Sequence, residues 1–345
     1  MASQSSAHLC VDQSKKLPTT PPSEYDEFIE QTHQLGPCQS SILVLIASHA
    51  RLLLTNLESL ESDPSFNWLP LPDPYKSHPN RYTCTVGCCN RLVCISEIVN
   101  TRFVLVNPSI ASASFGFGYD ACNDDYKIVG VMEYYEGKII RDVAVYSLRK
   151  NSWRVVETTK SSKKSAHTME NQNGILLDNH LLHWIVRQSS DNHRRILCFD
   201  LQNEKWVPDD ISVPVNFKDD GYETRYHYKL AVLQGYLCVL IAKSRHHDYE
   251  TVDLWAMKEY GVAESWVTLL SLSHQRVARI RNIYPLCYRE DSAQEILVCK
   301  VDKFDNNTAK FVWYKTSDEQ FEREVELDCD VTFNLVDAHV CLGSM

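Results

Sequence analysis

From residue 41 onward, short apolar runs alternate with polar turns, which is the pattern of β-strands. Typical runs are ILVLI (42–46), YKIVGVM (126–132), LLHWIV (181–186) and YLCVLIA (236–242). No stretch of a dozen residues in this part carries apolar positions at helical spacing. We therefore predict an all-β domain over residues 41–345.

The runs come in pairs, and the pairs repeat. VYSLRKNSW (145–153) and CFDLQNEKW (198–206) share an aromatic residue, a Leu, a polar turn and a closing Trp. DLWAMKEYGVAESW (253–266) and WYKTSDEQF (313–321) follow the same scheme, so successive closing aromatics are 53, 60 and 55 residues apart. A repeated unit of several short strands is typical of a β-propeller blade. We predict a β-propeller-like fold of about six blades, with a β-sandwich as the alternative.

The two ends of the chain receive different predictions. Residues 1–40 are rich in Ser, Thr, Pro and Gln and contain LPTTPP (17–22), which cannot be helical. Residues 23–35 can form a short helix with Ser23 as its N-cap, so we expect a flexible arm with one short helix. The C-terminal run VTFNLVDAHVCL (331–342) is expected to complete the first blade and close the ring.

Composition and charge exclude several classes of protein. Apolar residues make up 44% of the chain, enough for a sizeable core, and no apolar run is long enough to span a membrane. The formal net charge is −10 without a long basic run, so we expect neither nucleic acid nor a membrane as partner. Thirteen cysteines without a secretory leader indicate reduced thiols in the cytoplasm or nucleus. Those within apolar runs are expected to be buried as small hydrophobic residues.

The sequence carries no convincing catalytic or metal-binding signature. The G-x-G at 116–118 lacks the third Gly and the helix of a dinucleotide-binding loop. The HHD at 246–248 fits a solvated loop better than a metal site, because further ligands are missing. The DD pairs at 124–125 and 219–220 fit turns better than an acid/base pair. We expect no catalytic residue, no cofactor and no metal, hence no enzyme.

Five ordered motifs resemble one known family. They are GCCNRLVCIS (87–96), VNPS (106–109), FGFGYDACNDDYKIV (115–129), VAVYSLRKNSWRVVE (143–157) and ILCFDLQNEKW (196–206). Together they resemble the F-box-associated domain of plant F-box and F-box/kelch proteins, of which the S-locus F-box type is nearest. The resemblance runs from about residue 42 to residue 330. It implies a propeller-like domain that captures a target protein for ubiquitination, with an F-box that docks the Skp-type adaptor of a cullin–RING ligase.

The chain departs from the family pattern in two places. Leu17-Pro18 is followed by TTPPSEYDEFIEQTHQL, without the aliphatic positions of three F-box helices, so the F-box region is expected to be degenerate or lost. Only SIASAS separates the VNPS corner from FGFGYD, so the second blade is expected to lack an outer strand. We predict the recognition subunit of an SCF-type ubiquitin ligase. The alternative is a stand-alone interaction module, or a truncated F-box-less paralogue, without ligase coupling. A carbohydrate-binding or hydrolytic propeller is disfavoured because no acidic residues converge.

Recognition is expected on the face that carries the long connections. In a blade of antiparallel strands a to d, the b–c and d–a connections emerge on one face. The predicted b–c connections are 132–138, 187–193, 243–250 and 302–308, and the predicted d–a connection is 208–228. Long connections on a rigid scaffold usually carry recognition, and Tyr and Arg are enriched where binding energy concentrates. The candidate partner-binding residues are Tyr134, Tyr135, Arg187, Tyr222, Arg225, Arg245, His246, His247 and Tyr249.

Overall fold

The structure is a computed structural model, and its described residues are almost entirely β-strand. Two short helical segments, η3 (Ala263–Ser265) and α2 (His274–Val277), lie among the strands. The structure describes residues 42–47, 51–56, 67–70, 83–89, 92–97, 110–134, 139–156, 167–170, 173–178, 180–188, 191, 193–217, 224–246, 248–289, 292–302, 309–316, 320–326 and 335–341.

The first three sheets are built from strands between residues 42 and 156, and the C-terminal strand joins the first of them. The first blade has the order β24 (Leu335–Cys341), β1 (Ile42–Ala47), β2 (Arg51–Asn56), β3 (Asn67–Pro70). The second sheet pairs β4 (Thr83–Cys89) with β5 (Leu92–Glu97). The third blade has the order β6 (Ile110–Asp120), β7 (Asp125–Tyr134), β8 (Ile139–Ser147), β9 (Ser152–Val156).

The other three sheets follow in sequence order. The fourth blade is built from β10 (His167–Met169), β11 (Ile175–Leu177), β12 (Leu181–Gln188), β13 (Arg194–Asp200), β14 (Lys205–Trp206) and β15 (Ile211–Ser212). The fifth blade is β16 (Thr224–Leu233), β17 (Tyr236–Arg245), β18 (Asp248–Met257), β19 (Trp266–Ser273). The sixth blade is β20 (Ile280–Arg289), β21 (Ser292–Asp302), β22 (Ala309–Lys315), β23 (Gln320–Glu326).

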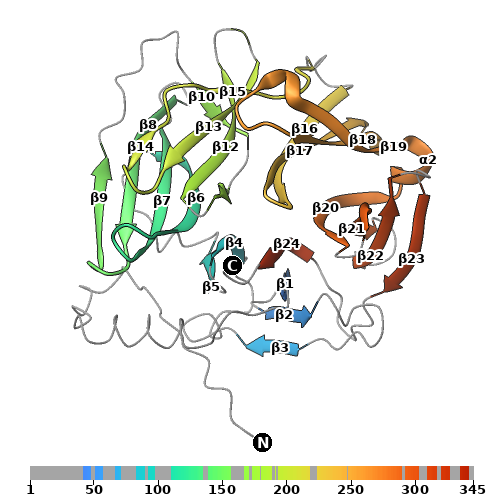
Figure 1. Cartoon of the computed structure of the whole chain (residues 1–345), viewed down its shortest axis with the longest axis horizontal. Helices are drawn as coiled ribbons and strands as arrows, with labels where there is room; N and C mark the ends of the chain where they lie inside the picture. The colour runs from blue at the N-terminus through green and yellow to red at the C-terminus, as the bar shows by residue number, and fades with distance from the viewer. Residues whose placement is uncertain are drawn as a thin grey trace, which may run out of the picture.

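The sheets surround a common centre, as in a β-propeller (Figure 1). Their inner strands contact one another in a closed series: β24, β4, β6, β11, β16, β20 and again β24. The C-terminal strand β24 pairs antiparallel with β1, so the first blade combines both ends of the folded chain. The predicted propeller class and the predicted closure by the C-terminal run are therefore confirmed.

The described residues form six sheets, in keeping with the expected number of about six blades, but the sheets differ in completeness. Four sheets have the plain four-stranded form of a complete blade. In the fourth blade the inner and outer strands are each split into two short pieces, β10 with β11 and β14 with β15. The second sheet has two strands among the described residues, and the segment between β5 and β6, on which the expected loss of an outer strand depends, lies outside them. The VNPS corner, the N-terminal arm with its expected helix, and the Asp pair at 219–220 lie outside the described residues.

The repeated aromatic residues close the outer hairpins, as predicted. Trp153, Trp206, Trp266 and Phe321 each stand at the beginning of an outermost strand. Each pairs across the hairpin with the strand before it, for example Trp206 with Phe199, whose rings lie 5.4 Å apart. Cross-strand aromatic pairs of this kind stabilise a sheet and fix its register.

The hydrophobic core lies between neighbouring blades. Val129 and Val143 of the third blade pack in one cluster with Leu182 and Trp184 of the fourth, and all four are fully buried. Because each sheet is covered on both sides, the central strands are nearly continuous apolar runs instead of alternating ones. Cys198, Cys238 and Cys299 are at most 1% exposed, which confirms for these three that cysteines in the apolar runs serve as small core residues, whereas Cys94 is only partly buried.

Candidate functional site

The strand order gives the ring two faces with different connections. The turn face carries the connections from the first to the second strand of a blade and from the third to the fourth. The loop face carries the connections from the second to the third strand and between blades. The fourth and fifth blades have described residues on both faces, so the two faces can be compared directly.

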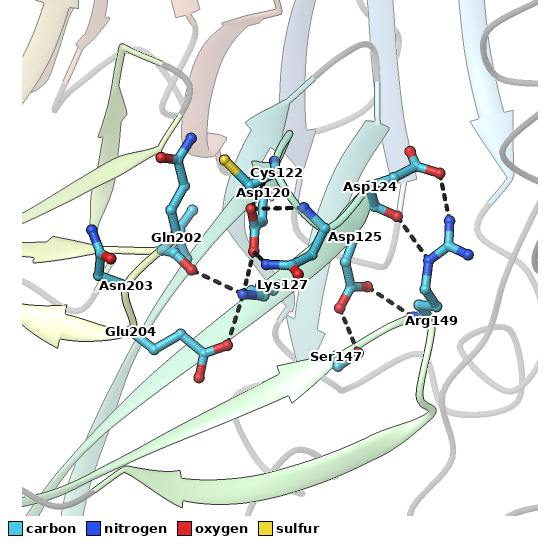
Figure 2. Close-up of polar contacts among 12 residues, drawn as sticks. Asp120, Cys122, Asp124, Asp125, Lys127, Ser147, Arg149, Gln202, Asn203 and Glu204 are labelled. Carbon is cyan, nitrogen blue, oxygen red and sulfur yellow. Dashed lines mark hydrogen bonds and ion pairs between the residues drawn. The ribbon is translucent and has the colours of Figure 1, made fainter.

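A buried Lys on the turn face joins the third blade to the fourth. The ammonium nitrogen of Lys127 lies 2.6 Å from a carboxylate oxygen of Asp120 and 2.7 Å from one of Glu204 (Figure 2). It also donates to the carbonyl oxygen of Leu201 at 2.9 Å. Arg154 forms a second ion pair with Glu204. The Lys127 side chain is 4% exposed and the Asp120 side chain 0%, so this contact is an ionic clamp between blades.

The turn that leads to Lys127 is organised by Asp120. Its Oδ1 accepts the backbone N–H groups of Cys122 and Asn123, and its Oδ2 accepts the Asn123 amide at 2.7 Å. Asp124 completes the turn with φ of 48°, a left-handed conformation that Asp tolerates better than most residues. Burial raises the pKa of Asp120, but the hydrogen bonds from Lys127 and Asn123 outweigh it and hold this pKa below its ordinary value.

The fourth blade repeats this turn with a different sequence. Asp200 accepts the backbone N–H groups of Gln202 and Asn203 and the Asn203 amide. Glu204 has φ of 50°, matching Asp124 in the first turn. The spacing Asp-x-x-Asn therefore occurs in both turns, and the two turns have the same geometry. The turn in the fourth blade places the Glu204 carboxylate next to Lys127.

Asp125 and Asp124 use their carboxylates to fix the next hairpin. Asp125 accepts the Ser147 hydroxyl at 2.5 Å and the backbone N–H of Arg149 at 2.8 Å. Arg149 forms an ion pair with Asp124, which also accepts the Tyr119 hydroxyl at 2.5 Å (Figure 2). The interpretation of the first DD pair as a turn is confirmed for Asp124, and Asp125 is the first residue of β7.

A second contact on the turn face joins the fourth blade to the fifth. Nε2 of His183 lies 2.7 Å from the hydroxyl of Tyr260, which extends from the turn between β18 and β19. His183 is 0% exposed, and burial lowers its pKa to about 4. The Tyr260 hydroxyl also interacts with the thiol of Cys198, whose pKa burial raises to about 11. The His183 imidazole and the Cys198 thiol are therefore neutral near pH 7, and they serve the packing between the blades.

The turn face thus uses its polar side chains to hold turns and blades together. Among the described residues, no group of three or more His, Cys, Asp or Glu side chains is placed to hold a metal ion. The buried carboxylate of Asp120 has a Lys as its counterion, and that of Asp125 accepts a hydroxyl and a backbone N–H. Structural ion pairs account for this region without a reacting group.

The loop face of the fifth blade gathers four of the predicted binding residues. Arg225 in β16 pairs with Ser244 in β17, which in turn pairs with Tyr249 in β18. Arg245 lies one position further along and pairs with Asp248. Arg225 and Arg245 are exposed, and Tyr249 is partly buried. Strand register therefore fixes these side chains at one end of one sheet.

His246 occupies the tip of this end. The connection between β17 and β18 is a two-residue turn, 246–247, and His246 has φ of 50°. Left-handed residues are usual in two-residue hairpin turns. The segment 243–250 is therefore a tight hairpin between long strands, and not the long loop that we predicted. The polar residues of 243–250 belong mostly to the two strands. A β-strand can extend beyond the hydrophobic core, and its side chains there are then polar.

The loop face of the fourth blade carries three Arg side chains. Arg187 in β12 stands directly opposite Arg194 in β13, and Arg195 follows. One carboxylate oxygen of Glu170 lies 2.7 Å from Nε of Arg187 and 3.6 Å from Nε of Arg194. Arg195 lies 3.6 Å from Asp191. Like charges directly opposite each other in a strand pair destabilise a sheet. Arg187 and Arg194 share the single carboxylate of Glu170, so this end of the fourth blade keeps a positive charge.

Arg194 links the two blades on this face. Its guanidinium lies 4.7 Å from the centre of the Tyr228 ring in β16 and donates to the carbonyl of Phe217 at 2.9 Å. The Phe217 ring stacks on Tyr226, with centroids 4.5 Å apart. Arg194 is 1% exposed. The loop-face ends of the fourth and fifth blades are therefore neighbours with a shared, packed base.

The structure brings together only part of the predicted binding set. Arg225, Arg245, His246 and Tyr249 meet at the end of the fifth blade, and Arg187 lies at the end of the fourth. His246 lies in a turn. The other four residues lie at the ends of strands, at positions where we predicted loops. Tyr134 is the last residue of β7 and pairs with Ile139, in the third blade. Tyr135, Tyr222 and His247 lie outside the described residues.

Sequence reasoning missed other basic residues of this region. Basic side chains at the loop-face ends of the fourth and fifth blades and in the segment after β19 are Arg187, Arg194, Arg195, Arg225, Lys243, Arg245, Arg276 and Arg279. Acidic side chains described in the same region are Glu170, Asp191, Asp248 and Glu250. Arg279 is paired with Asp302 of the sixth blade, and eight basic against five acidic side chains give a net charge of +3 on a chain of net charge −10. The R-R pair at 194–195 was the available signal, but it fell between the predicted connection 187–193 and the predicted strand that begins at residue 196.

The turn face of the same two blades has the opposite sign. Its described side chains include two basic residues, Lys205 and Lys258. The acidic ones are Asp178, Asp200, Glu204, Glu259 and Glu264. Two against five gives a net charge of −3. The concentration of positive charge is therefore a property of the loop face and does not extend over these blades as a whole.

Comparison with known proteins gives one family and several relatives. The family model of the F-box associated beta propeller domain matches residues 42–342. F-box protein CPR1 of Arabidopsis thaliana is 24% identical over 92% of this chain and 80% of its own length. F-box proteins At4g22390 and At3g07870 of the same plant are 28% and 27% identical, and the matches cover 66% and 52% of this chain. The chain spans 56% and 49% of their lengths. No helix in the described part of the chain is long and apolar enough to cross a membrane.

Proposed function

Because this chain belongs to the F-box associated beta propeller domain family, we propose that it is the substrate-recognition subunit of an SCF-type ubiquitin ligase. The family match carries the proposal, since it spans the whole ring from β1 to β24. The three relatives are F-box proteins by name, which supports the same role. In this role the propeller binds a target protein, and a Skp-type adaptor links it to a cullin.

The loop face is the proposed target-binding surface. Arg225, Arg245, His246 and Tyr249 are held by strand register on a rigid sheet, which lowers the entropy lost on binding. Tyr and Arg are also the side chains that most often dominate binding energy at protein interfaces. The turn face is less suited, because many of its polar groups are already engaged between blades and within turns.

We propose binding and not catalysis as the activity, and a reducing compartment, the cytoplasm or nucleus, as its location. The buried carboxylates of Asp120, Asp125 and Glu204 on the turn face are held by internal ion pairs and hydrogen bonds. Burial raises the pKa of the Cys198 thiol to about 11 and of the Cys238 thiol to about 12, which keeps both protonated and unreactive. Such thiols suit a cytosolic core.

Adaptor binding tests the ligase role. The full-length chain is titrated with a purified Skp-type adaptor by calorimetry, and we expect a sub-micromolar dissociation constant. Circular dichroism verifies that the propeller is folded. If the folded protein does not bind the adaptor, the result supports the alternative, an interaction module without ligase coupling.

Target capture tests the surface. The triple variant Arg225→Ala, Arg245→Ala, His246→Ala, which spares the core-packed Tyr249, should retain the wild-type melting temperature and lose the proteins that wild type captures from plant extract. The matched control Lys150→Ala, Glu259→Ala, Glu264→Ala changes three exposed residues of the turn face and should capture them normally. Equal capture by both variants contradicts the assignment of the loop face.

A further inference from the structure

The charge of the loop face indicates the chemistry of what it binds. Six basic side chains form what we term the basic cluster: Arg187, Arg194 and Arg195 of the fourth blade and Arg225, Lys243 and Arg245 of the fifth. We propose that the basic cluster binds an acidic peptide segment of the captured protein. This inference rests on the proposed function and specifies the class of its target.

The local acidic groups do not neutralise the basic cluster. Glu170 is shared between two Arg side chains, and Asp191 lies near both His193 and Arg195. Glu250 pairs with Lys243 at 2.6 Å. Asp248 stands opposite Arg245, so the six basic side chains against four acidic ones leave a net charge of +2 at these strand ends.

The carboxylates themselves respond to this excess. The hydrogen bond from Lys243 lowers the pKa of Glu250, and the charges of Arg245 and His274 add to the effect. A backbone hydrogen bond from His193 lowers the pKa of Asp191, and the charges of His193 and Arg195 act in the same direction. Anionic groups are therefore favoured at two separate points of this face, in neighbouring blades.

The geometry suits carboxylate side chains that are spaced along a chain. Five of the six groups are guanidinium groups, whose planar donors match a carboxylate with two parallel hydrogen bonds. Arg187 is 42% exposed and Arg195 26%, while the buried Arg194 supports them from below. Their positions are set by strand register, so the donors are arranged before binding.

The acidic residues between the Arg side chains favour a peptide over a nucleic acid. A nucleic-acid backbone carries a charge at every nucleotide and would bring phosphates against Asp191, Asp248 and Glu250. A peptide can place neutral residues opposite these carboxylates and acidic residues opposite the Arg side chains. A carboxylate and a phosphorylated side chain share this anionic chemistry, so the test includes both.

The test measures binding of three labelled peptides to the full-length chain by fluorescence anisotropy. The peptides alternate Gly with Glu, with phosphoserine or with Gln. We expect the Glu peptide to bind and the Gln peptide not to bind. Raising the ionic strength from ~0.1 M to ~1 M, which shortens the Debye length from about 10 Å to about 3 Å, should weaken binding at least about tenfold. Tighter binding of the phosphoserine peptide would identify a phosphorylated segment as the source of the anion.

Charge reversal locates the interaction. Arg225→Glu with Arg245→Glu should weaken binding of the Glu peptide by about tenfold or more, because attraction becomes repulsion at two positions. Lys205→Glu with Lys258→Glu makes the same change in net charge on the turn face of the same blades and should weaken binding less than about threefold. A third pair, Arg225→Gln with Arg245→Gln, should give an intermediate loss, which separates loss of charge from misfolding.

Three results would overturn the inference: equal binding of the Glu and Gln peptides, equal loss in both charge-reversal variants, or tighter binding of a single-stranded oligonucleotide of equal charge. These results are distinguishable from failure of the proposed function. Adaptor binding and target capture by a chain that ignores acidic peptides would retain the ligase role and remove only this inference. Peptide binding without adaptor binding would retain the basic cluster and remove the ligase coupling.

Discussion

The turn face and the loop face of the same blades use charged residues in opposite ways. On the turn face, Lys127 and Glu204 are buried, lie 2.7 Å apart and connect two blades. On the loop face, Arg225 and Arg245 are exposed at strand ends. A buried ion pair contributes to a unique arrangement of its elements, whereas an exposed charge has little effect on stability and stays available to a partner. Burial therefore separates the charges that maintain the ring from those that can bind.

The sharpest test of this contrast removes the buried Lys. Lys127→Met leaves Asp120 without its ammonium partner in the interior, and we expect the free energy of unfolding to fall by about 3–5 kcal/mol. Denaturant-induced unfolding measures the change. Lys205→Met removes an exposed Lys from the same face and should change stability by less than about 0.5 kcal/mol.

A small effect of Lys127→Met would show that the clamp is not needed for stability. Should the variant fail to fold, the triple variant Asp120→Asn, Lys127→Met, Glu204→Gln removes all three charges together. It is expected to recover part of the loss, because no uncompensated charge stays buried.

A second test uses the pH dependence of the contact between the fourth and fifth blades. The pKa of His183 is about 4 in the folded protein, against about 6.5 in an unfolded chain. The unfolded state therefore binds a proton that the folded state does not bind, so stability falls as the pH is lowered through this window. The loss should reach roughly 3 kcal/mol by its lower end.

Unfolding measured between neutral and acid pH checks this slope. His183→Gln should flatten it, whereas His246→Gln, at the exposed tip of the loop-face hairpin, should retain the wild-type slope. An unchanged slope in His183→Gln would assign the acid sensitivity to other groups.

The third test asks whether the loop face also contains a structural charge. Arg194→Met removes the hydrogen bond to the Phe217 carbonyl and the contact with the Tyr228 ring. We expect a loss of roughly 1–3 kcal/mol, since a buried carbonyl loses its donor. Arg195→Met, at the neighbouring and more exposed position, is the matched control and should cost less. Equal costs would mean that burial does not distinguish the two Arg side chains.

The smallest effect on stability is expected from the exposed charges of the loop face. Arg225→Gln and Arg245→Gln should each change the free energy of unfolding by less than about 0.5 kcal/mol. The same variants are expected to weaken peptide binding, so stability and binding should separate. A loss of stability as large as that of Arg194→Met would place these residues in the framework and break the comparison.

The local motifs of the fold could be predicted from sequence because each is encoded by adjacent residues. The closing Trp of each outer hairpin and the turn around Asp124 depend on contacts a few residues apart. The contact of Lys127 with Glu204 spans 77 residues and two blades, and no local pattern specifies it. The pairing of β24 with β1 was predicted, but only because a propeller must close.

The positions of the candidate binding residues were predicted in part for the same reason, and their role in binding stays a prediction. Tyr and Arg residues near connections were recognisable as candidates, so Arg225 and Arg245 were found. Arg194 was missed because it stood between the predicted connection 187–193 and the predicted strand from residue 196, and only the packing of Tyr228 against it reveals its place. The tight turn at His246 was also missed, because nothing in the polar run 243–250 indicates that the strands continue.

The pairing of β24 with β1 also has a consequence for biosynthesis. β1 gains β2 as a neighbour early in synthesis, but Leu45 pairs with Ala338 on its other edge, so β1 acquires its second neighbour only after β24 has been made. Until then, one edge of β1 is an open template for other strands, the situation in which nascent chains aggregate. The ring therefore matures in one late step, and a chain that stops before residue 335 would leave the ribosome with that edge still exposed.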